Sequence, residues 1–336
     1  MNQKYLIPLT AVFLLFLAAY TGIERAGLQW FFGFVFPYFA IIAFLAGFVY
    51  KVLDWEKSAV PFRIPTTCGQ QKSLPWIKQS TIDNPNTSSG VFIRMALEIF
   101  LFRSLFRNTK AAFNKNASNR LSYSWEIFLW VGALAFHYAF LVVLLRHFRF
   151  FTSPVPSCIQ FLEKLDGIVQ LGLPGIFLSG VVLLAATLFL LARRIFDEKV
   201  TYISQAADYF PLFLIIGIAA TGLSMRYFTK VDIVGIKEIT MGIVTFSPVS
   251  PEGVGGLFYA HLFLVCILFV YFPMSKLMHM GGIFLSPTRN MANNTRAKRH
   301  VNPWNYDVDT HTYEQYEDHF RDKMIEAGLP VDKKES

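Results

Sequence analysis

The sequence has few cysteines and few charged residues, and both shortages narrow what the chain can be. Its three cysteines, Cys68, Cys158 and Cys266, are widely separated and form no Cys-x-x-Cys pair. The chain therefore shows no sign of holding an iron–sulfur cluster or a structural zinc of its own. Only 16% of the residues are charged, whereas 54% are hydrophobic, so long uncharged stretches are unavoidable.

Six long apolar runs account for this imbalance. A membrane-spanning helix needs about 20 predominantly apolar residues and satisfies its own backbone polar groups in lipid. A water-soluble all-α protein with buried helices explains one such run but not six, so we predict an all-α integral membrane protein with six transmembrane helices. The first run, after Lys4, could also be a cleaved signal peptide; we take it as a spanning helix. The runs cover residues 5–22, 30–52, 127–145, 168–192, 210–228 and 254–277.

The net charge of +8 reflects orientation in a membrane and not binding to nucleic acid. Lysine and arginine concentrate on the cytoplasmic side of membrane proteins. Residues 54–124 carry ten Lys or Arg and four Asp or Glu, and residues 289–300 carry four basic residues and no acidic one. We therefore predict a multi-pass protein of a prokaryotic inner membrane, with both termini and this long loop in the cytoplasm.

These signals divide the chain into five segments. The first is the N-terminal span with its outer turn (1–29), and the second span follows (30–53). A cytoplasmic loop (54–124) precedes a four-helix core (125–282), and a cytoplasmic tail (283–336) completes the chain.

Within the loop, residues 91–106 are apolar apart from Arg94, Glu98 and Arg103, and Arg107 follows directly. The spacings of four, five and four residues place these charges on one helical face. We predict a helix in the membrane interface with its apolar face in lipid; a seventh span is disfavoured by those charges. Residues 313–327 predict a short tail helix that ends before Gly328 and Pro330.

Four of the seven histidines, His137, His147, His261 and His279, lie in or at the ends of apolar runs. Ionisable residues in membrane helices are costly and usually functional, and neutral imidazole ligates haem iron. A histidine that only hydrogen-bonds between helices is the simpler explanation for one residue, but less so for two pairs on two helices. We therefore predict two b-type haems.

The spacing predicts which histidines pair. His137 and His147 are ten residues apart, and His261 and His279 are eighteen apart, or about 15 and 27 Å along a helix. Because the third and sixth helices run antiparallel, His147 meets His261 in an outer pair, and His137 meets His279 in an inner pair. The two spacings differ by about 12 Å, which helix tilt and a kink at Pro273 must absorb.

Three arginines flank the predicted outer pair. Arg146, Arg149 and Arg226 could bind the haem propionates, which are carboxylates. They could equally anchor helix ends among lipid headgroups.

The two histidine intervals resemble those of the cytochrome b family of the respiratory nitrate reductase gamma subunit, over residues 30–282. Residues 65–76, 101–108, 299–305 and 320–324 resemble more closely the membrane subunits of the Dsr complexes of sulfur-metabolising prokaryotes. The resemblance implies a five-helix core plus one added N-terminal helix. It also implies that the four histidines ligate two haems b and that a quinone, such as menaquinone, binds near the outer haem. Lys164 stands where that family has a quinol-binding lysine.

The same resemblance implies a cytoplasmic iron–sulfur partner like the K subunit of Dsr complexes, together with other subunits of that complex. We expect the loop helix at 91–106 and the tail at 300–320 to dock this partner. The predicted function is electron transfer between quinol and the partner in dissimilatory sulfur metabolism. A membrane cytochrome b of a related heterodisulfide reductase or nitrate reductase complex is the first alternative. A haem-free membrane scaffold or transporter is the second.

Overall fold

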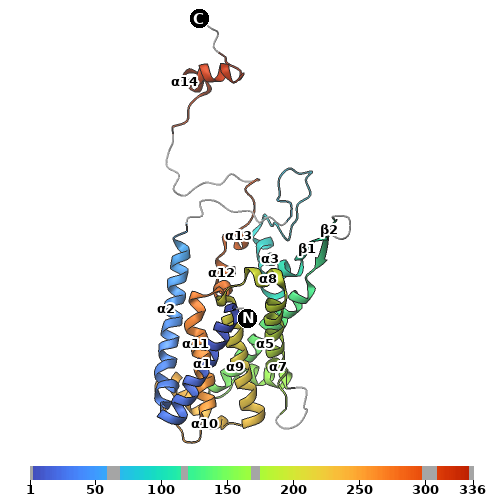
Figure 1. Cartoon of the computed structure of the whole chain (residues 1–336). Helices are drawn as coiled ribbons and strands as arrows, with labels where there is room; N and C mark the ends of the chain where they lie inside the picture. The colour runs from blue at the N-terminus through green and yellow to red at the C-terminus, as the bar shows by residue number, and fades with distance from the viewer. Residues whose placement is uncertain (1–2, 59–68, 115–119, 168–174, 297–308, 333–336) are drawn as a thin grey trace.

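The computed structural model describes residues 3–58, 69–114, 120–167, 175–296 and 309–332, and within them six helices are long and apolar enough to cross a membrane. The prediction of an all-α integral membrane protein with six spans is confirmed (Figure 1). The start of the fourth predicted run, 168–174, lies outside the described residues. The spans are α1 (Gln3–Ala26), α2 (Phe36–Glu56) after the π-helix η1 (Phe31–Val35), α5 (Ile127–Phe151), α7 (Leu178–Phe196), α9 (Ala206–Ser224) with the π-helix η2 (Met225–Thr229), and α11 (Gly256–Tyr271) with the 3-10 turn η3 (Phe272–Met274).

The spans pack as a bundle whose outer surface is apolar. Helix α1 packs against α9 and α11, α2 packs against α11, and α7 packs between α5 and α9. In the apolar 18-residue stretch of each span, no more than 39% of the residues are buried within the chain. The remaining apolar side chains face outward, as expected where lipid and not water is the surrounding solvent.

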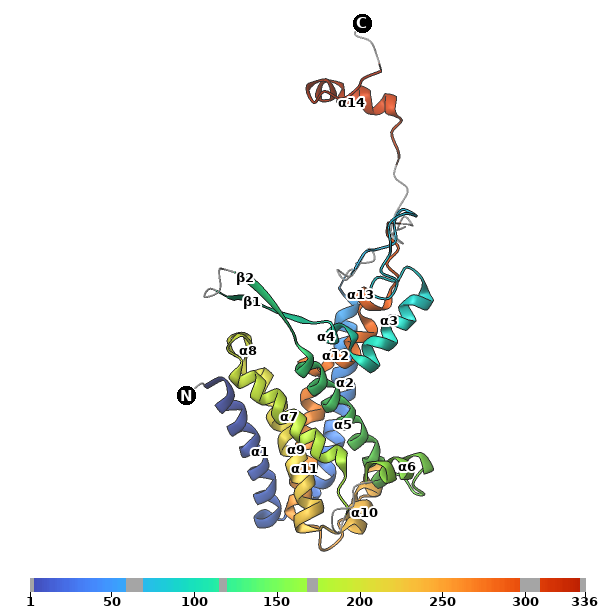
Figure 2. The same cartoon turned by 90° about the vertical axis from the view of Figure 1, so that its right-hand side faces the viewer.

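Short elements gather at the two ends of the bundle (Figure 2). At one end, which we call the outer end, lie α6 (Ser157–Asp166) and α10 (Ile233–Val244). At the opposite, inner end lie α3 (Ser88–Leu101), α4 (Arg103–Phe106), α8 (Glu198–Ile203), α12 (His279–Leu285) and α13 (Pro287–Asn290). The start of α1 lies there too, because the Lys4 ammonium donates to the carbonyl of Tyr202 at 3.4 Å.

A β-hairpin at the inner end was not predicted. Strand β1 (Thr109–Asn114) pairs antiparallel with β2 (Arg120–Trp125), and Thr109 stands opposite Trp125. Lys110 at its base binds the Asp197 carboxylate at 2.6 Å, which ties the hairpin to the start of α8. This hydrogen bond holds the pKa of Asp197 below its ordinary value.

The prediction of one continuous interfacial helix over 91–106 is wrong. Two helices, α3 and α4, are separated by Phe102, whose backbone is left-handed. The charges consequently do not share one face: Arg94 and Glu98 are buried toward α13, whereas Arg103 and Arg107 bind Asp83. The tail helix is confirmed as α14 (Tyr313–Glu326), which begins with a capping box at Thr312 and Gln315.

The last span is broken, not kinked. Proline lacks the N–H that a continuing helix requires, and at Pro273 the α-helix gives way to η3 and then to a second 3-10 turn, η4 (Lys276–Met278). Ser275 caps that turn by accepting the N–H of Leu277 at 3.2 Å. His279 is therefore the first residue of a separate helix, α12, and does not continue the helix of His261.

Candidate functional site

The four histidines that lie in or at the ends of the apolar runs meet in the predicted pairs. The imidazole centroids of His147 and His261 are 6.5 Å apart, and those of His137 and His279 are 6.0 Å apart. We keep the names outer pair and inner pair for them. The rings of the outer pair are inclined by 18°, whereas those of the inner pair are inclined by 83°.

The broken helix resolves the mismatch between the two histidine spacings. On one continuous helix His279 would stand about 27 Å from His261, against about 15 Å between their partners on α5. The turns η3 and η4 redirect the chain before α12 begins. His279 thereby reaches His137 without an extreme helix tilt.

Every histidine of the two pairs uses its Nδ1 atom in a hydrogen bond. His137, His147 and His279 approach the carbonyls of Ala133, Val143 and Lys276 at 2.8, 2.6 and 2.7 Å. A carbonyl can only accept, so each Nδ1 carries the proton. In a neutral imidazole the lone pair then resides on Nε2, the atom left for a metal.

His261 is oriented by a third helix, through Thr221 of α9. Its Nδ1 lies 2.8 Å from the Thr221 hydroxyl, and that hydroxyl is itself 2.7 Å from the carbonyl of Gly217. A hydroxyl has a single proton, and Thr221 donates it in the hydrogen bond to the carbonyl of Gly217. Toward His261, the Thr221 oxygen therefore accepts a hydrogen bond from Nδ1. Thr221 was not identified from the sequence, since a lone threonine in an apolar helix usually bonds only to its own helix.

The pairs fit an iron held between two imidazoles. Nitrogen–metal bonds of about 2 Å, with the distance from each nitrogen to its ring centre, place two ligating imidazole centroids about 6 Å apart, close to both observed separations. No group of three or more His, Cys, Asp or Glu side chains in the described ranges could hold a metal ion. Two histidines alone suit haem, because the porphyrin supplies the other four ligands.

A cationic cluster lies at the outer end, next to His147 in the chain. Arg146 binds the buried Asp166 at 2.5 Å, and Asp166 also accepts the N–H and the hydroxyl of Ser179. The guanidinium carbons of Arg146 and Arg226 lie 3.3 and 3.8 Å from the centroid of the Phe177 ring. Within the described residues the buried Nε atoms of both arginines have no hydrogen-bond partner. Arg226 donates to the carbonyl of Gly175 at 3.3 Å. The two arginines thus keep donors to spare, which suits an additional anion.

The other two predicted outer residues lie on or against α6. Arg149 binds Glu163 at 2.7 Å, so its guanidinium already has a carboxylate partner. Lys164 is exposed near the end of α6. Within the described residues, Arg146 and Arg226 stack on Phe177, and Arg149 and Lys164 do not.

Six apolar spans, with two facing pairs of histidines whose Nδ1 atoms are all hydrogen-bonded, define a multi-pass membrane protein of the cytochrome b type. The chain belongs to the nitrate reductase gamma subunit family, which matches residues 90–296. This match includes α5, α7, α9 and α11 with all four histidines, and it begins after α1 and α2.

Two archaeal proteins are similar along most of the chain. The protein named Hdr-like menaquinol oxidoreductase cytochrome b-like subunit from Archaeoglobus fulgidus is 43% identical over 280 residues, covering 81% of this chain and 83% of that protein. Its counterpart from Archaeoglobus profundus is 42% identical over 278 residues, covering 81% and 82%. The respiratory nitrate reductase 1 gamma chain of Escherichia coli is 30% identical over 113 residues, covering 31% of this chain and 50% of that protein.

Proposed function

We propose that this chain is a di-haem cytochrome b subunit that transfers electrons between menaquinol and a cytoplasmic iron–sulfur protein. The observation that carries the proposal is the pairing of four imidazoles at 6.0 and 6.5 Å, with every Nδ1 already engaged. Haem b, when bound, exchanges one electron at a time. The four histidines would supply two imidazole ligands to each of two haems, among apolar helices.

At the outer end, we assign Arg146 and Arg226 to haem propionates, because each has a buried Nε that finds no partner among the described residues. Arg149 plays a lesser part in this proposal, since Glu163 neutralises it. Lys164, exposed on α6, is assigned to the approach of quinol, on the family resemblance alone.

The electron donor and the partner are proposed from the relatives and from the loop and tail segments. The names of the two archaeal relatives include menaquinol oxidoreductase, which supports menaquinol as donor. The resemblance of the loop and tail to Dsr-complex membrane subunits supports an iron–sulfur partner like the K subunit and a role in dissimilatory sulfur metabolism. The Hdr-like naming of the relatives equally supports the alternative of a heterodisulfide-reductase-like complex.

The test is to purify the chain from the membranes of cells grown with iron and to measure the ratio of haem to protein. A reduced-minus-oxidised spectrum of low-spin haem b, at two haems per chain, is expected, with reduction by a menaquinol analogue. A purified, folded chain without haem would overturn the proposal and leave the scaffold or transporter alternative. Haem reduced by dithionite but by no quinol would overturn the assignment of the donor.

The proposed location is a prokaryotic inner membrane with both termini in the cytoplasm. It rests on the basic residues of 54–124 and 289–300, because lysine and arginine concentrate in the cytoplasmic loops of membrane proteins. A reporter active only in the cytoplasm should work after Gln70 and at the C-terminus, and should fail after Asp232. The opposite pattern would invert the orientation.

A further inference from the structure

The connection between α3 and α4 reaches one of the inner histidines. We call residues 88–106 the α3–α4 cap. Two side chains of α5 donate to its carbonyls: the indole of Trp130 to Leu101 at 2.7 Å and the hydroxyl of Tyr138 to Phe100 at 2.8 Å. Because Trp130 and Tyr138 are eight residues apart, the cap runs along α5 to the level of His137.

Phe102, between the two helices, has an unusual backbone. Its φ is 48° and its ψ is 48°, the left-handed region that bulky side chains seldom occupy. Its N–H donates to the carbonyl of Glu98 at 3.2 Å, the last helical hydrogen bond of α3, and its left-handed backbone ends the helix. Such a conformation costs on the order of 1 kcal/mol for a residue other than glycine. It persists only where the surroundings determine it, and it is a reason to look for function.

The Phe102 ring meets the imidazole of His137. The two ring centroids are 4.9 Å apart and the rings are inclined by 83°, an edge-to-face contact. Phe136, the preceding residue on α5, makes a second edge-to-face contact at 5.0 Å. The His137 imidazole is thus held by two aromatic rings and by the hydrogen bond to Ala133, while it faces His279.

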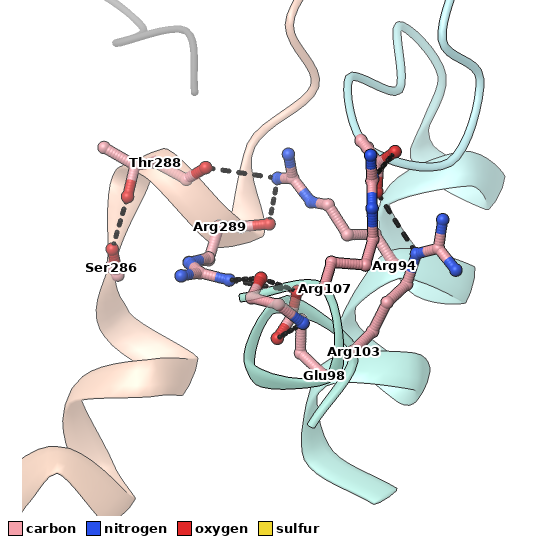
Figure 3. Close-up of polar contacts among 9 residues, drawn as sticks. Arg94, Glu98, Arg103, Arg107, Ser286, Thr288 and Arg289 are labelled. Carbon is pink, nitrogen blue, oxygen red and sulfur yellow. Dashed lines mark hydrogen bonds and ion pairs between the residues drawn. The ribbon is translucent and has the colours of Figure 1, made fainter. Parts of the chain in front are cut away.

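The cap is clamped to the helix that follows His279. Buried Arg94 donates to the carbonyls of Thr288, Arg289 and Met291 at the end of α13. Glu98 receives the guanidinium of Arg289 at 3.1 Å and the N–H of Ser104 at 3.2 Å (Figure 3). Only Ser286 separates α13 from α12, whose first residue is His279. One element therefore supports both members of the inner pair.

Asp83 secures the cap from its other side. Its carboxylate binds Arg103 at 3.1 Å and also Arg107, which stand at the first residue and at the C-cap of α4. Partial burial alone would raise the pKa of Asp83, but the hydrogen bonds and charges of the two arginines outweigh burial and lower it. With Arg94, Glu98 and Asp83 all engaged, Phe102 cannot leave its strained conformation without breaking several contacts.

We propose that Phe102 is a positioning residue that sets the orientation of the His137 imidazole, and with it the near-perpendicular arrangement of the inner pair. This inference rests on the proposed haem function. The mutual angle of two axial imidazoles governs the anisotropy of the electron paramagnetic resonance signal of low-spin haem. The inner haem should therefore give the more anisotropic signal and the outer haem, with rings 18° apart, the less anisotropic one.

The experiment compares four substitutions in the intact, haem-loaded chain by paramagnetic resonance and redox titration. Phe102→Gly removes the ring and relieves the backbone, and the relief offsets part of the packing that is lost with the ring. Phe102→Leu removes the ring and keeps the strain. Both should move the largest g-value and the midpoint potential of the inner haem and leave the outer haem unchanged. Phe102→Tyr keeps the ring edge and should retain the original signal.

Phe106→Leu is the matched control. Phe106 belongs to the same cap and packs on Trp125 and Trp130, with centroids at 4.9 and 4.8 Å. Among the ring contacts of the described residues, His137 meets Phe102, Phe136 and His279 but not Phe106. An inner signal that Phe102→Gly leaves unchanged would overturn the inference. So would a change that Phe106→Leu reproduces, since the effect would then belong to the cap in general. A chain that binds no haem would instead defeat the proposed function, which distinguishes the two failures.

Discussion

The outer and inner histidine pairs use the same residue and differ in how the chain holds them. The outer pair lies on two continuous helices, α5 and α11, and a third, α9, orients His261 through Thr221. The inner pair joins α5 to a short helix that follows a break at Pro273, and the α3–α4 cap closes over it. Continuous helices and one side-chain hydrogen bond position the outer pair, whereas loop contacts and a strained residue position the inner one.

The difference indicates where the site can respond to a partner. Continuous membrane helices deform little, so the outer pair should keep its geometry whatever binds at the inner end. The inner pair depends on α13 and on residues 69–107, which include α4. Both segments lie at the inner end of the bundle. We expect perturbations there to change the inner pair alone, and the following predictions test this separation.

The largest effect should come from removing a ligand. His147→Ala or His261→Ala should abolish the outer haem and leave the inner one, so that haem per chain falls by half. His137→Ala or His279→Ala should do the reverse. Haem content and the resonance signal that remains are the measurements. If His137→Ala and His261→Ala removed the same haem, the pairing described here would be wrong.

Loss of the Thr221 hydroxyl should weaken only the outer pair. Partners that orient a ligating histidine typically contribute a factor of roughly 10 to 100 in affinity. We therefore expect Thr221→Val to lower the affinity for the outer haem by about tenfold, while Thr221→Ser, which retains the acceptor, stays near the original value. Haem retention during titration with apomyoglobin measures this. An equal loss from both sites would argue against the contact to His261.

Helix α1 should make a smaller contribution, again to the outer pair. The Glu24 carboxylate accepts the N–H of Gly256 at 2.8 Å and so caps α11, five residues before His261. Removing such a cap costs about 1 kcal/mol, so Glu24→Ala should lower the temperature at which the outer haem is released. Glu24→Gln retains an acceptor and should have about half the effect. A shift in the release of the inner haem would contradict this role.

The smallest effect should be a pH response confined to the inner pair. Because the pKa of Asp83 is lower in the folded state than its ordinary value of 3.8, its ion pairs stabilise the cap above that pH. This stability is lost as the pH falls through about 4 and below. The contribution should not exceed about 1 kcal/mol, since the pairs are partly exposed.

In that acidic range, the inner resonance signal should therefore change before the outer one. Asp83→Asn should show the altered inner signal already at neutral pH and respond less to acid. An outer signal that changes first would contradict the assignment of Asp83 to the cap.

The sequence predicts the spans and both pairs because hydrophobicity and residue spacing are local and periodic. Pro273 was recognised, but a kink and a complete break leave the same trace in an apolar run. Phe102 could not be foreseen, since its left-handed backbone results from contacts with α5 and α13 that are remote in sequence. The hairpin did leave a signal: polar and apolar residues alternate in 120–125 after an Asn-rich stretch, a pattern typical of a strand after a turn.

The ten-residue interval between His137 and His147 has an electrical consequence. The interval corresponds to about 15 Å along α5, or roughly half of a hydrocarbon core about 30 Å thick. Moving one charge across a whole membrane changes its energy by about 2.3 kcal/mol per 100 mV. The energy of an electron exchanged between the two levels would therefore change by about half of this amount per 100 mV. The ratio of electron occupancy between the two levels would change about sevenfold. The spacing of two histidines on one helix would thus make internal electron transfer sensitive to membrane voltage.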